Sequence, residues 1–260
     1  AVVTFIIDLR KKDNEGMGFA AKSLRIKRNR GRDIALGVFC LLVVGFVLLV
    51  LASFAIMTFV SKYPYDLSFT GKHIETVLNK GMLKYLGNSL LIAVCVSAGG
   101  TFIGYITAYI TARTHNATLT KVLHLTSISS LAIPGIVLGL GYVICFKTTP
   151  IYGTFIILII VNIIHFFSSP YMMAYNAMKK LNPNFEDVGK TLRVGRLRML
   201  RDVMIPNTLD TIAEMFGYFF VNSMITISAV TFLYKTSTMP LAIMINQLDG
   251  DMMLEAAAFV

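Results

Sequence analysis

The chain has 260 residues, of which 55% are apolar and 15% are charged, and its formal net charge is +10. An ordinary soluble domain carries about 25% charged residues, so this composition argues against a soluble globular protein. The basic residues lie between long apolar runs and form no basic face interleaved with aromatics, which argues against nucleic-acid binding. The sequence therefore predicts an all-α fold, a polytopic bundle of transmembrane helices.

The N-terminal 33 residues differ from the rest of the chain. Residues 1–7 are apolar and charged residues follow directly, so we interpret 1–7 as the end of an earlier span. The rest, up to residue 33, is rich in Lys and Arg and is predicted to be a basic cytoplasmic linker. The transmembrane domain is predicted over residues 34–260. Because the chain starts at Ala1 and stops within an apolar run, we expect a fragment cut at both ends.

Apolar runs predict about six spans, because about 20 apolar residues suffice to cross a bilayer. The third run is interrupted by Pro134 and Gly135, which predict a helix bend because proline removes a backbone hydrogen bond. Glycine pairs at helical spacing in two of the runs favour close packing between helices of this chain. The runs are 34–60, 85–112, 122–146, 154–175, 207–233 and a truncated sixth at the C-terminus.

The distribution of Lys and Arg predicts the orientation. Segments 8–33, 113–121 and 176–206 together hold 18 of these residues, whereas the alternate loops hold 6. Because cytoplasmic loops carry the excess of basic residues, the first set is predicted to be cytoplasmic. We expect a multi-pass membrane protein.

The cytoplasmic segment 176–206 is predicted to contain a short amphipathic helix. Asn184 is a candidate cap, and Phe185, Val188 and Leu192 fall on one face of the helix after it. Gly189 is placed on this face and is expected to let a partner surface come close. Such a face requires cover, either from the lipid interface or from a groove on a soluble partner.

This segment resembles the EAA loop of permease subunits of binding-protein-dependent ABC importers. Asp187, Val188 and Gly189 stand at the Glu-Ala-Ala positions, after Glu186, and Ile205-Pro206 matches the apolar-Pro ending. Arg193 replaces the usual glycine, and we expect Gly195 to supply the turn. Residues 132–135 and the order of spans are also similar to this family. The resemblance implies a coupling loop that consists of Phe185, Glu186, Asp187, Val188, Gly189, Leu192, Arg193, Gly195 and Pro206.

Several partners are implied by this resemblance. ATP and Mg²⁺ are expected in a dimer of separate ATPase subunits and no cofactor in this chain, because Asn184 stands where a P-loop needs its first glycine. The resemblance places the chain in the bacterial inner membrane, and segment 1–7 with the basic linker suggests that it is the C-terminal half of a tandem permease. A second permease half or subunit and a periplasmic or lipid-anchored substrate-binding protein are expected to complete the transporter. Residues 65–70 are most similar to ferric-iron permeases, and phosphonate or polyamine importers are the alternatives.

Polar residues within the fifth run allow two interpretations. Asn222, Ser223 and Thr226 share one side of the predicted helix, where they either line a translocation path or bond to neighbouring helices. A different class of function, a secondary transporter driven by an ion gradient, would need charges near the middle of the spans. A scaffold without transport is a third hypothesis. Catalytic and metal-binding residues are not expected in this chain.

Overall fold

The computed structural model describes residues 29–114, 117–250 and 253–260, which belong to two compact units. One unit is Met82–Asn246, and the other combines the described part of Val2–Gly81 with Gln247–Val260. The predicted segment 1–7 and most of the predicted linker lie outside the described residues. The predicted domain boundary at residue 34 therefore stays a prediction.

The unit around the first complete span is built on the helix α2 (Arg30–Thr58). Asn29 begins it, and its Oδ1 atom accepts a hydrogen bond from the backbone N–H of Arg32 at 3.4 Å. The mean hydropathy of α2 reaches 3.2, yet its apolar window has no buried residue. A helix that is apolar on every side and 29 residues long suits a lipid environment.

A β-hairpin follows α2 where the sequence predicts only a polar loop. Strand β1 (Val60–Lys62) pairs antiparallel with β2 (Asp66–Phe69), and Val60 lies opposite Phe69. At the start of β2, the side chain of Asp66 accepts a hydrogen bond from the backbone N–H of Ser68 at 3.0 Å. The hairpin was missed because its strands have three and four residues, too few to show a periodicity. The same unit contains α3 (Lys72–Asn79) and α14 (Leu254–Phe259), which packs against α2 and α3.

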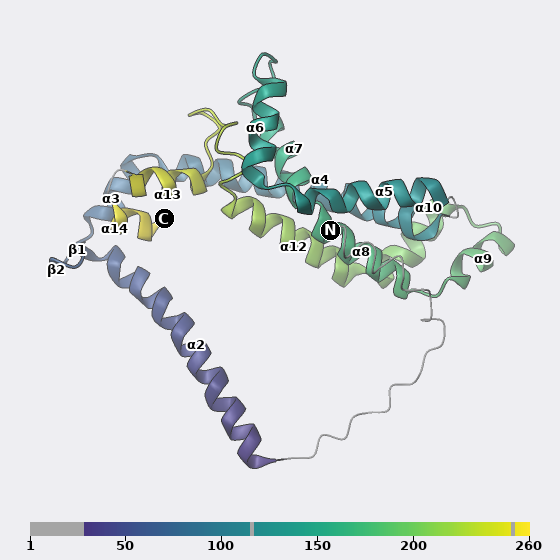
Figure 1. Cartoon of the computed structure of the whole chain (residues 1–260), viewed down its shortest axis with the longest axis horizontal. Helices are drawn as coiled ribbons and strands as arrows, with labels where there is room; N and C mark the ends of the chain where they lie inside the picture. The colour runs from purple at the N-terminus through teal and green to yellow at the C-terminus, as the bar shows by residue number, and fades with distance from the viewer. Residues whose placement is uncertain (1–28, 115–116, 251–252) are drawn as a thin grey trace. The chain divides into compact units, whose positions relative to one another are not determined.

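The other unit is a bundle of helices around α4 (Met82–Arg113), which packs against α7, α8 and α12 (Figure 1). Serine, threonine and glycine make up much of the buried side of α4. The remaining elements in chain order are α5 (Ala117–Ser129), η1 (Ser130–Ala132), α6 (Gly135–Phe146), α7 (Phe155–Phe166), α8 (Ser168–Lys180), α9 (Asn184–Thr191), α10 (Arg196–Met199), the π-helix η2 (Leu200–Met204), α11 (Ile205–Asn207), α12 (Leu209–Ile225) and α13 (Leu241–Gly250).

Glycines of α4 allow the close approach of α12. A Cβ atom at Gly100 would lie 2.8 Å from the ring of Phe219, and one at Gly104 would lie 3.3 Å from Cε of Met215. Gly139 of α6 similarly lies against the backbone of Ala229, whose carbonyl oxygen would be 2.8 Å from an added Cβ. The predicted close packing at glycines is confirmed, and it occurs within the chain.

Two helices, α2 and α4, are long and apolar enough to cross a membrane unbent. Two bent pairs raise the number of candidate spans among the described residues to four. Thr118–Ala132 and Gly135–Phe146 meet at 107°, and Phe155–Phe166 and Ser168–Lys180 meet at 54°. The larger bend lies at Pro134, as the sequence predicts. The predicted all-α membrane fold is confirmed, with the hairpin as an addition.

The fifth span is shorter than predicted. Helix α12 has 17 residues and ends at Ile225, whereas the apolar run continues to residue 233. Thr226 takes an extended conformation, and its hydroxyl donates to the carbonyl of Asn222 at 2.7 Å. The extended backbone of Thr226 takes the chain out of the helix at this position.

Candidate functional site

Helix α9 is the element that carries most of the predicted coupling residues, and it lies at one end of the helical unit beyond α8 (Figure 1). The helix begins at Asn184, so that residue is not its cap. The side chain of Asn182 accepts the backbone N–H of Asn184 at 2.9 Å instead. Glu186 and Asp187 lie in the first turn, where carboxylates interact favourably with the helix dipole.

The end of α9 is a turn at Arg193. This residue has φ of +53°, in the left-handed region that favours glycine. The N–H of Val194 donates to the carbonyl of Gly189 at 2.8 Å, which is the hydrogen bond of a Schellman motif. Gly195 is extended, with φ of −65° and ψ of 149°. The expectation that Gly195 supplies the turn is therefore wrong, because Arg193 itself adopts the conformation of the glycine that it replaces.

One side of α9 presents apolar side chains to the outside. Phe185, Val188 and Leu192 are 37%, 53% and 68% exposed. We refer to these three residues as the apolar stripe. The structure thus agrees with the sequence on the helix and on its apolar face, whereas the role of that face stays a prediction.

Next to the apolar stripe, α9 packs against α10 through Gly189. A Cβ atom at Gly189 would overlap the terminal methyl group of Met199, which is itself buried. The surface that comes close to this glycine therefore includes Met199 of the same chain, and its contact with a partner protein stays a prediction. Gly189 sets the distance between α9 and α10.

Glu186 joins α9 to the end of α4 through an ion pair with Arg113. Nε of Arg113 lies 3.9 Å from Oε1 of Glu186, and the two side chains are 8% and 19% exposed. Nη2 of Arg113 also donates to the carbonyl of Leu181 at 2.9 Å and to that of Met178 in the last turn of α8. One guanidinium therefore touches α4, α8 and α9.

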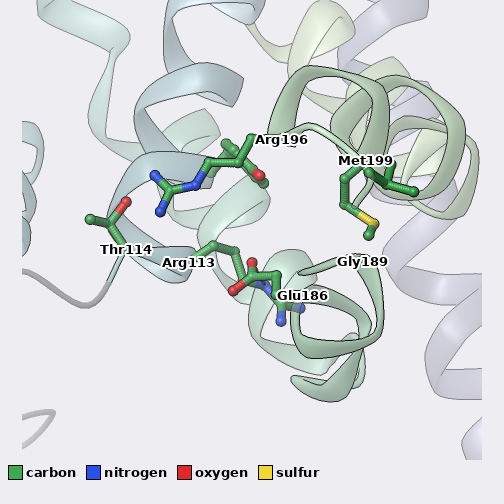
Figure 2. Close-up of a pocket in the computed structure, with 8 residues that line it drawn as sticks. Arg113, Thr114, Glu186, Gly189, Arg196 and Met199 are labelled. Atoms are coloured by element: carbon green, nitrogen blue, oxygen red, sulfur yellow. Dashed lines mark ion pairs between the residues drawn. The ribbon is translucent and has the colours of Figure 1, made fainter. Parts of the chain in front are cut away.

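A small pocket of about 60 Å³ lies beside this ion pair. Figure 2 shows Arg113 and Glu186 together in it, with Gly189 and Met199 on one side and Arg196 extending toward Thr114 on the other. Among the described residues, Nε of Arg113 and Oε1 of Glu186 are buried without a hydrogen-bond partner. Their separation is too long for a direct hydrogen bond.

The helical conformation between α10 and α12 continues past Pro206. A π-helical turn, η2, leads from α10 into α11, in which Pro206 occupies the first turn. The chain leaves the helix at Thr208, whose hydroxyl pairs with that of Tyr105 of α4 at 2.7 Å. The helical segment therefore runs one residue past Pro206, to Asn207, because a proline in a first turn lacks only an N–H that the helix does not need.

The polar residues of α12 lie at its C-terminal end. Ser223 and Thr226 are buried, and Nδ2 of Asn222 donates to the carbonyl of Tyr218 at 2.8 Å. Of the described buried side chains, Oγ of Ser223 is one that has no hydrogen-bond partner. Side chains that pack between helices are expected to be buried within the chain, as Ser223 and Thr226 are. A role of Asn222, Ser223 and Thr226 in a translocation path stays a prediction.

Arg113 was not predicted to be part of this site. It appears in the sequence as one of two basic residues in a short loop, far along the chain from Glu186. Its position as the last residue of α4 is the signal that points to it, since a basic residue there can reach the carbonyls of a neighbouring helix end. Nothing in the sequence specifies which carboxylate it meets.

Within the residues that the structure describes, no group of three or more His, Cys, Asp or Glu side chains is placed to hold a metal ion. The site on α9 has an exposed apolar stripe and a charged contact between Glu186 and Arg113.

Comparison with known proteins gives a consistent result. Residues 100–260 match the family described as binding-protein-dependent transport system inner membrane component. Over 163 residues, 62% of this chain, the sequence is 26% identical to FbpB 1 of Haemophilus influenzae, named as a putative ferric transport system permease protein. It is 25% identical over the same length to the ferric transport system permease protein FbpB of Actinobacillus pleuropneumoniae. The aligned part is 26% and 24% of those proteins, so the chain spans about a quarter of their length.

Proposed function

Because this chain belongs to the family of binding-protein-dependent transport system inner membrane components, we propose that it is the transmembrane permease subunit of an ATP-driven importer. The family makes the chain a membrane protein and a transport subunit. The finer proposal is that its helices form part of the substrate path and that α9 couples them to a separate ATPase.

The apolar stripe of α9 is the observation that carries this proposal. Burying a Leu or Val side chain completely contributes about 1.5–3 kcal/mol, so Val188 and Leu192 together can anchor a protein contact. The stripe is exposed, while Gly189 and Glu186 beside it are held by Met199 and Arg113. A helix that is fixed on one side and apolar on the other suits a groove on a partner.

The proposed mechanism is alternating access. Closure of an ATPase dimer on ATP and Mg²⁺ displaces α9, and the displacement reaches the spans through the contacts of α9 with α4, α8 and α10. A second permease half faces this one across the path. A periplasmic or lipid-anchored binding protein delivers the substrate to the outer loops at 61–84 and 234–251. The proposed membrane is the bacterial inner membrane, as the family name implies.

Ferric iron is the substrate that we propose. Two relatives that align with 62% of the chain are named as ferric transport system permeases, which supports iron over phosphonate or polyamine. The binding protein, and not a ligand cage in this chain, would select the ion. The permease then needs a path without strong metal ligands, since a tightly held ion would not leave.

Site-specific cross-linking tests the coupling role of α9. The chain, with Cys40, Cys95 and Cys145 replaced by serine, is expressed in membranes with a candidate ATPase subunit, and Val188→Cys and Leu192→Cys are labelled with a short thiol-reactive photo-cross-linker. We expect both variants to form a covalent adduct with the ATPase. The matched control is Gly87→Cys, an exposed position on α4 far along the chain.

Two results would contradict the proposal. Adducts with lipid headgroups alone would favour an interfacial helix. Substrate uptake that continues without any ATP-hydrolysing subunit and depends on an ion gradient would favour a secondary transporter. Uptake of ⁵⁵Fe-labelled ferric complexes, compared with phosphonate and polyamine, tests the substrate in the same vesicles.

A further inference from the structure

We propose that Arg113 is a positioning residue that ties α9 to α4 and α8, so that one side chain transmits the displacement of α9 to both helices. The inference rests on the proposed function, because the displacement comes from the ATPase. It adds a transmitting residue that lies outside the coupling loop itself.

Helix α9 needs such a contact because of its length. It has eight residues, and isolated helices shorter than about 12 residues are marginal in water. Its direction is therefore set by the contacts that hold its ends and its inner side. These contacts are the backbone link to α8, the packing of Gly189 on Met199, and the ion pair between Glu186 and Arg113.

Arg113 is suited to the role by its geometry. Nη2 donates to the carbonyls of Met178 and Leu181 at the end of α8, while Nε of the same planar group faces Glu186. A guanidinium is rigid, so its nitrogens cannot move independently of one another. A change in the position of Glu186 therefore acts on the end of α8 and, through the side chain, on the last turn of α4.

The environment strengthens the link. With 8% and 19% of their side chains exposed, Arg113 and Glu186 are screened less than a surface pair. Their two facing atoms lie 3.9 Å apart beside a pocket of about 60 Å³, so there is room for the pair to shorten or separate. Arg196, the other cation that lines the pocket, extends toward Thr114 (Figure 2).

The test uses the complete transporter with its ATPase and binding protein in proteoliposomes. Glu186→Gln removes the charge at nearly constant shape, and Arg113 keeps the carbonyls of α8 as partners, so the variant is expected to fold. The readouts are substrate transported per ATP hydrolysed and the amount of ATPase that co-purifies. We expect the substrate transported per ATP to fall about fivefold or more, because a coupling free energy is lost. The amount of co-purifying ATPase is expected to stay unchanged.

Asp202→Asn is the matched control, because it removes one negative charge from an exposed position on η2. Its transport per ATP is expected to stay within about twofold of the wild type, since exposed charges contribute little. Glu186→Asp, which keeps the charge, is expected to restore part of the loss seen in Glu186→Gln.

Two outcomes overturn the inference while the wild type is active. Glu186→Gln with unchanged transport per ATP means that the ion pair transmits nothing. Glu186→Gln that loses the ATPase during purification means that Glu186 binds the partner directly. A wild-type complex with no ATPase and no transport would instead overturn the proposed function, and the inference with it.

Discussion

Helices α4 and α9 both expose large apolar side chains, but only α4 is long enough to cross a membrane. In α4 the buried side consists largely of small residues, and Gly100 and Gly104 let α12 approach. In α9 the apolar stripe is exposed, and Gly189 beside it contacts α10. The comparison teaches that glycines mark the surface that the chain itself fills, whereas exposed apolar side chains mark a surface that something else covers, lipid for a span and, for α9, the proposed partner.

The largest expected effect is overpacking of α4 by Gly100→Leu. A Cβ atom there would already lie 2.8 Å from the ring of Phe219, so the longer side chain forces α4 and α12 apart. We expect a loss of about 3 kcal/mol in the free energy of unfolding, measured by thermal unfolding of the solubilised protein. Gly87→Leu, at an open position of the same helix, is the control. Equal losses in both variants would show that α4 is not specifically packed at Gly100.

The exposed side of α9 should respond in the opposite way. Leu192→Ser is expected to leave the unfolding temperature unchanged and to weaken ATPase binding about tenfold, because burial of a leucine is lost. Binding is measured by titrating labelled ATPase onto the permease in nanodiscs. Leu197→Ser removes an even more exposed leucine outside the apolar stripe and should weaken binding less. Equal weakening of ATPase binding by the two leucine variants would mean that the apolar stripe is not the surface that binds the ATPase.

The contact between α9 and α10 should give a smaller effect. Gly189→Ala is expected to destabilise α9 by about 1 kcal/mol, because the flexible side chain of Met199 has to move. In a Met199→Ala background the same change should stabilise α9, since alanine is then the better helix former by about 1 kcal/mol. Hydrogen exchange of the α9 amides measures both. If Gly189→Ala changes the stability of α9 in the same direction in both backgrounds, residue 189 does not contact Met199 directly.

The smallest effect is expected at the turn. Arg193→Gly relieves a left-handed conformation that costs an ordinary residue about 1 kcal/mol, and the added freedom of the unfolded chain offsets part of this. The amides of α9 should exchange about twofold more slowly as a result. Arg193→Ala keeps the unfavourable conformation and should give no protection. Slower exchange in the alanine variant would mean that the arginine side chain, and not the backbone, limits stability.

Much of the outer face of the site was predictable because it depends on local sequence. The spacing of Phe185, Val188 and Leu192 defines a helical face, and the bend at Pro134 results from the missing N–H of proline. The end of α9 was placed wrongly because sequence rules favour Gly195 over Arg193 for a left-handed turn. The hydrogen bond from Val194 to Gly189 explains how a non-glycine residue is tolerated there.

The inner face of the site was not predictable for a different reason. The contact between Arg113 and Glu186 and the packing of Gly189 on Met199 depend on where α4, α9 and α10 meet. A single sequence contains no signal that pairs these particular residues. The length of α12 was overestimated similarly, because apolar residues continue past Thr226 although the helix does not.

The π-helical turn Leu200–Met204 makes the linker between α10 and α12 sensitive to its length. Each residue of a helix is rotated by about 100° from the one before it, so a one-residue deletion there would turn α9 and α10 about the axis of the next helix by that amount. Insertions and deletions are usually tolerated in surface loops, but in this linker they would aim the apolar stripe in another direction. Natural variants should therefore accept substitutions between residues 200 and 204 far more readily than changes in their number.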